Sequence, residues 1–227
     1  MNVAFIPVRG GSKSIPMKNI KPLNGKPLVY WTVIAACNCQ YIDKVYVATD
    51  SDEIRKAVEA VMMEGKENFS KIEVIDRSPE SSSETASTES AMLEFAEKYE
   101  FDTIVLIQAT SPMLTSSDLD RGFCAFADKD TDSVFSVARQ KRFIWREDEF
   151  GFAHPINYDI FNRPRRQEFS GLLVENGAFF ITSREQLLKS KNRISGRMRM
   201  VEMSANSYFE IDEPDDWVIV ESLMKKL

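Results

Sequence analysis

The sequence predicts an α/β protein built on a doubly wound, mostly parallel sheet. Short apolar runs alternate with amphipathic helical stretches along most of the 227 residues, which is the pattern of successive βαβ units. The run at residues 103–108 (TIVLIQ) is apolar almost throughout, as in a strand whose two faces are both covered by helices. Polar residues follow several of these runs. In a parallel sheet such residues meet at the carboxyl edge, where ligands bind.

The expected strands are short apolar runs bounded by polar or turn residues. They cover residues 2–8, 44–50, 71–76, 103–108, 133–137, 176–182 and 198–203. The expected helices cover residues 27–39, 51–64, 85–99, 116–129 and 183–191, and a closing helix starts at Pro214. Ser51 is the expected N-cap of the second helix. Pro214, followed by Asp215 and Asp216, suits the first turn of the last helix.

The alternating pattern breaks between about residues 139 and 171, where aromatic residues and arginines replace clean periodicity. We interpret this stretch as an excursion from the core, either a small lobe or an oligomer contact. The chain is therefore expected to form one domain over residues 1–227, with residues 139–171 as a lobe within it.

Bulk composition limits the classes of function. The net charge is -6, whereas nucleic-acid-binding domains are usually basic, so no nucleic-acid partner is expected. No run of 18 apolar residues occurs, so no membrane span is expected. The first residues lack the features of a signal peptide. We expect a cytoplasmic protein.

The N-terminal segment carries an unusual charge pattern. Residues 1–42 contain no Asp or Glu, yet they include five basic residues: Arg9, Lys13, Lys18, Lys21 and Lys26. Two glycines directly after the first expected strand let the backbone turn sharply and present N–H groups to a ligand. Cations and free N–H groups together predict a polyphosphate site. The order Gly-Ser-Lys-Ser is not that of a Walker A loop, and no G-x-G-x-x-G fingerprint occurs.

An acidic counterpart lies near the C-terminus. If residues 209–212 are extended, Glu210 and Asp212 point to the same side, because side chains alternate along a strand. Two carboxylates near phosphates can hold Mg²⁺, which takes oxygen ligands and shares them with the substrate. The alternative is that these acids only cap the last helix. That alternative accounts for Asp212 but poorly for Glu210.

A set of segments places the chain near a known family. In order and spacing it resembles the acylneuraminate cytidylyltransferases, the CMP-sialic acid synthetases, through IPVRGGSKSIPMKNIKPLNGKPLVYWTV, VATDSDEI, DRSPE, LIQATSPML, DSVFSV, NGAFFI and YFEIDEPDDW. The resemblance spans nearly the whole chain. It implies a Rossmann-like nucleotidyltransferase fold and a homodimer. It also implies a Mg²⁺-dependent reaction of CTP with an acidic nine-carbon sugar, giving the CMP-sugar and pyrophosphate.

The resemblance also implies roles for individual residues. Arg9 and Lys18 would act on the triphosphate, and the further nucleotide contacts would be Gly11, Ser12, Asn19, Arg77 and Thr88. The sugar contacts would be Gln108, Arg146, Arg165 and Phe180, with Arg165 matching an arginine that binds the sugar carboxylate. Glu210 and Asp212 align with the family's two metal-binding carboxylates, although the first is Asp in the family.

One departure from the family bears on the sugar. Several N-acetylneuraminate enzymes carry an aromatic pair that packs on the N-acetyl group, but the matching region here reads Lys191-Asn192-Arg193-Ile194. Phe180 likewise stands where some members have Tyr. The deaminated sialic acid KDN is therefore a candidate beside N-acetylneuraminate, and Arg193 could decide the preference because polar pockets discriminate sharply.

Other functions remain open from the sequence. The chain could be a synthetase for CMP-legionaminate, CMP-pseudaminate or CMP-Kdo. It could also be a sugar-1-phosphate nucleotidyltransferase, or a non-catalytic nucleotide-binding module. The last is disfavoured because both the cationic loop and the paired acids are present.

Overall fold

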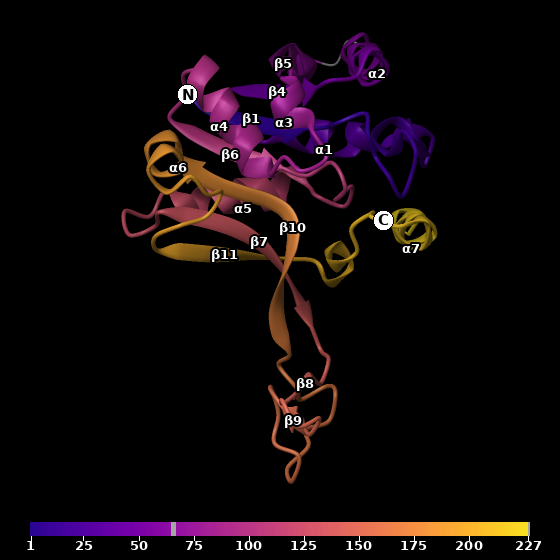
Figure 1. Ribbon diagram of the computed structural model, residues 1–227, viewed down its shortest axis with the longest axis vertical. Coiled ribbons are helices and arrows are strands. Elements are labelled where there is room, and N and C mark those ends of the chain that lie inside the picture. The colour runs from indigo at the N-terminus through magenta and orange to yellow at the C-terminus, as the bar shows by residue number, and fades with distance from the viewer. Residues whose placement is uncertain (65–66, 227) are drawn as a thin grey trace.

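A seven-stranded sheet forms the centre of the computed structural model, which describes residues 1–64 and 67–226 (Figure 1). Its strand order is β11-β7-β10-β6-β1-β4-β5. The strands are β1 (Asn2–Pro7), β4 (Lys44–Thr49), β5 (Ile72–Asp76), β6 (Thr103–Ile107), β7 (Ser133–Gln140), β10 (Leu172–Ser183) and β11 (Met198–Met203). β10 runs antiparallel to both β6 and β7, and the other neighbouring pairs are parallel. The predicted fold class is confirmed.

Helices cover both faces of this sheet. The main helices are α1 (Leu28–Asn38), α2 (Asp52–Met62), α3 (Pro79–Ser82), α4 (Thr88–Lys98), α5 (Ser116–Phe126), α6 (Arg184–Ser190) and α7 (Pro214–Met224). The apolar sides of α1, α2 and α5 share one core cluster with the sheet, whereas α4 and α6 pack into a second. The three-residue to five-residue 3-10 helices are η1 (Lys18–Ile20), η2 (Glu67–Lys71) and η3 (Ala205–Tyr208).

A third, smaller core joins the two ends of the chain. Ile15 and Leu28, from the basic segment, pack with Ile211 and Trp217, from the acidic segment and α7. The hairpin of β2 (Pro22–Leu23) and β3 (Lys26–Pro27) contributes Leu23 to the same cluster. This packing brings the predicted phosphate loop and the predicted metal ligands to one edge of the sheet.

Element boundaries agree with the sequence expectations except at a few places. Ser51 caps α2 as predicted, because its side chain accepts a hydrogen bond from the Ile54 N–H. The helix expected over residues 85–99 begins instead at Thr88, since Ser87 caps it. β7 and β10 extend beyond residues 133–137 and 176–182, because their far ends continue past the sheet as a two-stranded ribbon.

That ribbon carries an arm over residues 141–171, which projects from the body at the bottom of Figure 1. The short strands β8 (Trp145–Glu147) and β9 (Ala153–Pro155) pair within it. A small cluster stiffens the arm, with the rings of Phe143 and Tyr158 4.3 Å apart and the Arg163 guanidinium 4.5 Å from the Phe143 ring. Several large apolar side chains of the arm remain exposed: Trp145, Phe150, Phe152, Ile156, Ile160 and Phe161.

Within residues 1–64 and 67–226, we find no helix with the length and apolar character that crossing a membrane requires.

Candidate active site

A cavity of about 650 Å³ opens at the carboxyl edge of the sheet, where β1 and β6 end. Four separate parts of the chain meet there: the loop after β1, the loop after β6, the first turn of α4 and the segment before α7. Eight of the predicted residues line it, namely Arg9, Ser12, Lys18, Asn19, Thr88, Gln108, Glu210 and Asp212. The strand-end rule therefore located the cavity correctly.

The basic loop is held from behind by hydrogen bonds. The Gly10 N–H donates to Asp50 Oδ1 at 2.9 Å, and the Asn19 amide donates to the Arg9 carbonyl at 3.1 Å. A Cβ at position 10 would lie 3.0 Å from the Cβ of Ser51, so the loop runs close against the start of α2. Arg9 Nη1 donates to the Ser83 carbonyl at 3.2 Å. The loop thus has a fixed shape while Arg9 faces the cavity.

Lys18 joins the basic loop to the acidic segment. Its ammonium lies 2.9 Å from the Ile211 carbonyl oxygen and 3.0 Å from Asp212 Oδ1. The Lys18 side chain is only 12% exposed, so this contact is partly shielded from solvent. The Ser14 hydroxyl also donates to the Asp212 carbonyl. The Lys18 ammonium and the Asp212 carboxylate therefore form an ion pair in the wall of the cavity.

The structure separates the two interpretations of the C-terminal acids. Ile211 is buried and its N–H donates to the Thr110 carbonyl at 2.9 Å, so Glu210 and Asp212 on either side both face the cavity. Capping of α7 is performed by Asp216, whose carboxylate accepts from the Asp212 and Glu213 N–H groups at 3.0 and 2.8 Å. Glu210 and Asp212 are therefore free of the capping role.

The carboxylate pair has the chemistry of a shared Mg²⁺ site. Burial, and then the negative charge of Asp212, raise the pKa of Glu210 above its usual value. A cation at this place would relieve that repulsion. Among residues 1–64 and 67–226, no group of three or more His, Cys, Asp or Glu is arranged to hold a metal alone. Two carboxylates fit Mg²⁺ when substrate phosphates supply further oxygens.

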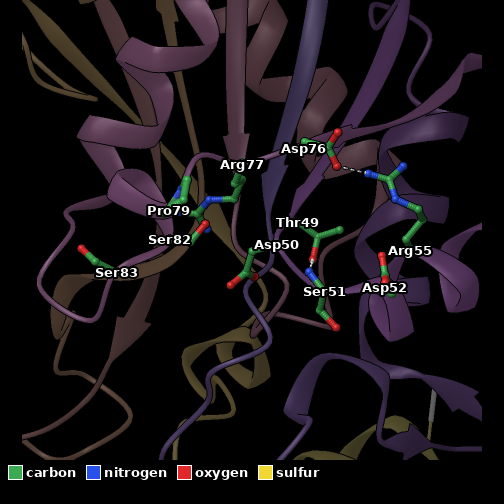
Figure 2. Close-up of a pocket in the computed structure, with 10 residues that line it drawn as sticks. All are labelled: Thr49, Asp50, Ser51, Asp52, Arg55, Asp76, Arg77, Pro79, Ser82 and Ser83. Carbon is green, nitrogen blue, oxygen red and sulfur yellow. Dashed lines mark hydrogen bonds and ion pairs between the residues drawn. The ribbon is translucent and has the colours of Figure 1, made fainter.

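Arg77 lies beside the main cavity rather than in it. It lines a cavity of about 210 Å³ together with Pro7, Arg9 and Thr88, all three of which also line the main cavity. Arg77 also lines a separate cavity of about 450 Å³. Figure 2 shows its side chain in that cavity, next to Ser82 and above Asp50. One Arg77 nitrogen, Nη2, donates to the Ser81 carbonyl, and its buried Nε has no partner. Burial lowers the pKa of Arg77.

Some predicted residues are not brought to the cavity. Gly11 lies in an exposed part of the loop and is not a lining residue. Arg146 and Arg165 lie exposed on the arm, away from the cavity of their own chain.

The assignment of Phe180 as a sugar contact is wrong for this structure. Its side chain is 1% exposed and packs in the core under α4 and α6. Arg193, proposed from the sequence to face the sugar, covers the Phe180 ring at 5.2 Å. Its guanidinium is held by Glu89 through bonds of 2.5 and 3.0 Å.

Several lining residues were given no individual role from the sequence: Ser14, Thr110 and Glu213 also face the cavity. Lys13, one of the basic residues that predicted the phosphate site, lines it as well. Each is a neighbour of a predicted residue in the basic loop, the loop after β6 or the acidic segment. Their closeness in the chain to the matched positions is the signal in the sequence that indicates them.

A doubly wound sheet with a cationic loop and paired carboxylates at its carboxyl edge defines a nucleotide-binding α/β protein. Residues 3–163 match the model of the cytidylyltransferase family. The chain belongs to this family.

Relatives of known name agree with this assignment. The chain is 38% identical over 222 residues to N-acylneuraminate cytidylyltransferase A of Danio rerio, and 30% identical over 225 residues to N-acylneuraminate cytidylyltransferase of Streptococcus agalactiae serotype V. Each match covers 96% of this chain, but only 49% and 52% of the relatives. This chain thus spans about half their length. It is also 27% identical to post-translational flagellin modification protein B of Campylobacter coli, covering 96% of this chain and 92% of that protein.

Solved structures support the same fold. The structure of CMP:2-keto-3-deoxy-manno-octonic acid synthetase complexed with CTP superposes with a TM-score of 0.70 at 19% identity, covering 99% of this chain and 98% of that one. A nucleotidyl transferase from Methanothermobacter thermautotroptrophicus gives a TM-score of 0.64 at 15% identity, covering 100% and 98%. The Rossmann-like nucleotidyltransferase fold is thereby established.

Proposed function

We propose that the chain activates a sialic-type acid with CTP, giving the CMP-sugar and pyrophosphate. The observation that carries this proposal is that Arg9 and Lys18 share one cavity with Glu210 and Asp212. Family membership and the named relatives support a cytidylyl transfer. The acidic sugar is the part of the proposal that comes from the relatives.

The chemistry needs no covalent nucleophile on the protein. The anomeric hydroxyl oxygen of the sugar forms a bond to the α-phosphorus and loses its proton, while the bond from that phosphorus to the β-phosphate oxygen breaks and pyrophosphate leaves. Such a transfer depends on positioning and on charge stabilisation. Arg9, Lys18 and the N–H groups of the loop would hold the phosphate oxygens. Glu210 and Asp212 would hold Mg²⁺, which neutralises charge on the triphosphate when bound.

We propose KDN as a substrate beside N-acetylneuraminate. The support comes from the sequence, because residues 191–194 lack the aromatic pair that packs on the N-acetyl group in several N-acetylneuraminate enzymes. In the structure, Arg193 from this segment pairs with Glu89, which follows the lining residue Thr88 in the chain. A cytoplasmic location is proposed as well, because the reaction requires CTP.

A substrate panel tests the function and the sugar together. Pyrophosphate release from CTP is expected with unphosphorylated nonulosonic acids and not with sugar 1-phosphates. The value of kcat/KM for KDN should equal or exceed that for N-acetylneuraminate. A preference above tenfold for the N-acetyl sugar removes the KDN proposal. Turnover with legionaminate, pseudaminate or Kdo alone favours the related synthetases, and no turnover with any acid sugar refutes the function.

We further propose that the arm joins two copies of the chain into a homodimer. Large exposed apolar surfaces on a soluble protein mark interaction sites, and Phe161 at 94% exposure and Phe150 lie on this arm. Arg146 and Arg165 are carried by the same arm, so a second copy could receive them at its cavity. That arrangement would reconcile their expected role with their distance from the cavity of their own chain.

The variant Phe161→Asp should convert a dimer into a monomer, because a charge would be buried against the second copy. Light scattering coupled to size exclusion measures this. Met63→Asp is the matched control, since Met63 is also a highly exposed apolar residue, away from the arm. A wild-type monomer, or an unchanged mass for Phe161→Asp, contradicts the proposed interface.

A further inference from the structure

An irregularity in β10 lies directly behind the cavity. β10 pairs with β7 through Glu175↔Val137 and again through Phe180↔Phe135, so residues 176–179 lie opposite the single residue Ser136. The interrupted ladder is repaired by a side chain, because the Phe179 N–H donates to the buried Ser136 hydroxyl at 3.0 Å. The bulge is therefore a stable feature, and bulges often re-aim groups near active sites.

The first residue of the bulge anchors the acidic segment. The Asn176 amide donates to the Ser207 carbonyl at 3.0 Å and to the Ser207 hydroxyl at 3.1 Å. Both residues are buried, and Ser207 in turn donates to the Ser204 carbonyl at 2.7 Å. Ser207 lies within η3, three residues before Glu210. Asn176 thus fixes the point from which the acidic segment starts.

The second residue of the bulge is in contact with two cavity residues from different elements. A Cβ at Gly177 would lie 2.7 Å from Gln108 Oε1 and 3.2 Å from Glu210 Oε2. Its φ of +66° also favours glycine. Gln108 and Glu210 therefore reach their places only because position 177 has no side chain.

We infer that the Asn176–Gly177 bulge is the positioning element that sets where Gln108 and Glu210 stand in the cavity. These are the predicted sugar side and metal side of the site, so the inference rests on the proposed function for its kinetic consequence. Arg9 is held by the Ser83 carbonyl, and Lys18 by Ile211 and Asp212, rather than by Gly177. Disturbing Gly177 should therefore act first on Gln108 and Glu210, and change the sugar and metal requirements more than the contacts of Arg9 and Lys18 with CTP.

The variant Gly177→Ala tests this inference. The nearest atom to the added methyl is the far end of the flexible Gln108 side chain, so the fold can adapt while that side chain moves. We expect the KM for the sugar and the Mg²⁺ concentration for half-maximal rate to rise about tenfold or more. At saturating Mg²⁺, which restores the metal contact to the triphosphate, the KM for CTP should stay within about threefold of the wild-type value.

Gly25→Ala is the matched control. Gly25 has a φ of +79°, so alanine suffers the same backbone strain there, but a Cβ at this position meets no atom within 4 Å. If Gly177→Ala shows the same constants as Gly25→Ala, the inference is overturned. The double variant Gly177→Ala/Gln108→Asn shortens the displaced side chain. It should recover the thermal stability that Gly177→Ala loses. No recovery of stability would count against the packing argument.

A crystal structure of Gly177→Ala separates this inference from the proposed function. If the wild-type protein forms no CMP-sugar, the proposed function fails, but the positions of Gln108 and Glu210 in the variant still decide the inference. Displaced side chains support the positioning role. Side chains that keep their wild-type positions refute it, whatever the activity.

Discussion

Replacing Asp212 with alanine is expected to lower kcat/KM by roughly 10²–10³-fold, the usual loss when a group that stabilises transition-state charge is removed. Asp212 faces the cavity next to Glu210, and its carboxylate also holds the Lys18 ammonium at 3.0 Å. The variant loses half of the carboxylate pair proposed to hold Mg²⁺. Pyrophosphate release at saturating Mg²⁺ measures the effect. Because the Asp212 side chain is largely exposed, thermal unfolding should change little.

Asp215→Ala provides the control for this variant. Asp215 is an exposed acid in the first turn of α7, three residues from Asp212, and it does not line the cavity. Asp215→Ala removes the same charge from the same region. Because Asp215 does not line the cavity, the activity of this variant should stay near that of the wild type. Equal losses in the two variants would indicate a general electrostatic effect. Activity of Asp212→Ala within about tenfold of wild type would contradict the role of the carboxylate pair.

Replacing Lys18 with alanine is the second large expected effect. Its ammonium is the group that lies between the basic loop and the acidic segment, with Ile211 and Asp212 as partners. Removing it leaves Glu210 and Asp212 without the cation that pairs with Asp212, and removes the cation proposed to contact the triphosphate. We expect kcat to fall by about 10²-fold or more and the KM for CTP to rise, measured with varied CTP at saturating sugar.

Lys21→Ala is the matched control for Lys18. Lys21 belongs to the same acid-free segment, but its ammonium lies 4.4 Å from the Trp217 ring, and the residue does not line the cavity. A CTP-specific effect in Lys18→Ala alone supports the assignment. If Lys21→Ala also lowers kcat and raises the KM for CTP, the effect comes from the combined positive charge of the basic segment and not from Lys18 itself.

The parts of the fold that could be predicted from the sequence are those controlled by local pattern. The apolar period of each strand and helix, and the strand-end rule, were sufficient to place Arg9 and Gln108 at one edge. Lys18 was predicted from the charge pattern of its segment and from the family resemblance. The alternation around the buried Ile211 likewise predicted that Glu210 and Asp212 share a side.

Phe180 shows where local pattern fails. Both faces of β10 are covered, so Phe179 and Phe180 are both buried. The apolar character of the two residues therefore does not indicate which face of the sheet each side chain occupies. The bulge at residues 176–179 also shifts the alternation, and its pairing depends on β7, about 40 positions earlier in the chain. The positions of Arg146 and Arg165 depend on how the arm folds, which local pattern does not indicate. The cavity that they are proposed to reach belongs to a second copy of the chain.

A crystal structure of the protein with CTP and Mn²⁺ in place of Mg²⁺ is the most direct test of the proposed site, because Mn²⁺ can be located by its anomalous signal. We expect one metal peak at about 2.0–2.2 Å from carboxylate oxygens of Glu210 and Asp212 and from phosphate oxygens. We also expect the triphosphate to contact Arg9 and Lys18. A nucleotide bound elsewhere, or a metal that contacts neither carboxylate, would contradict the proposed site.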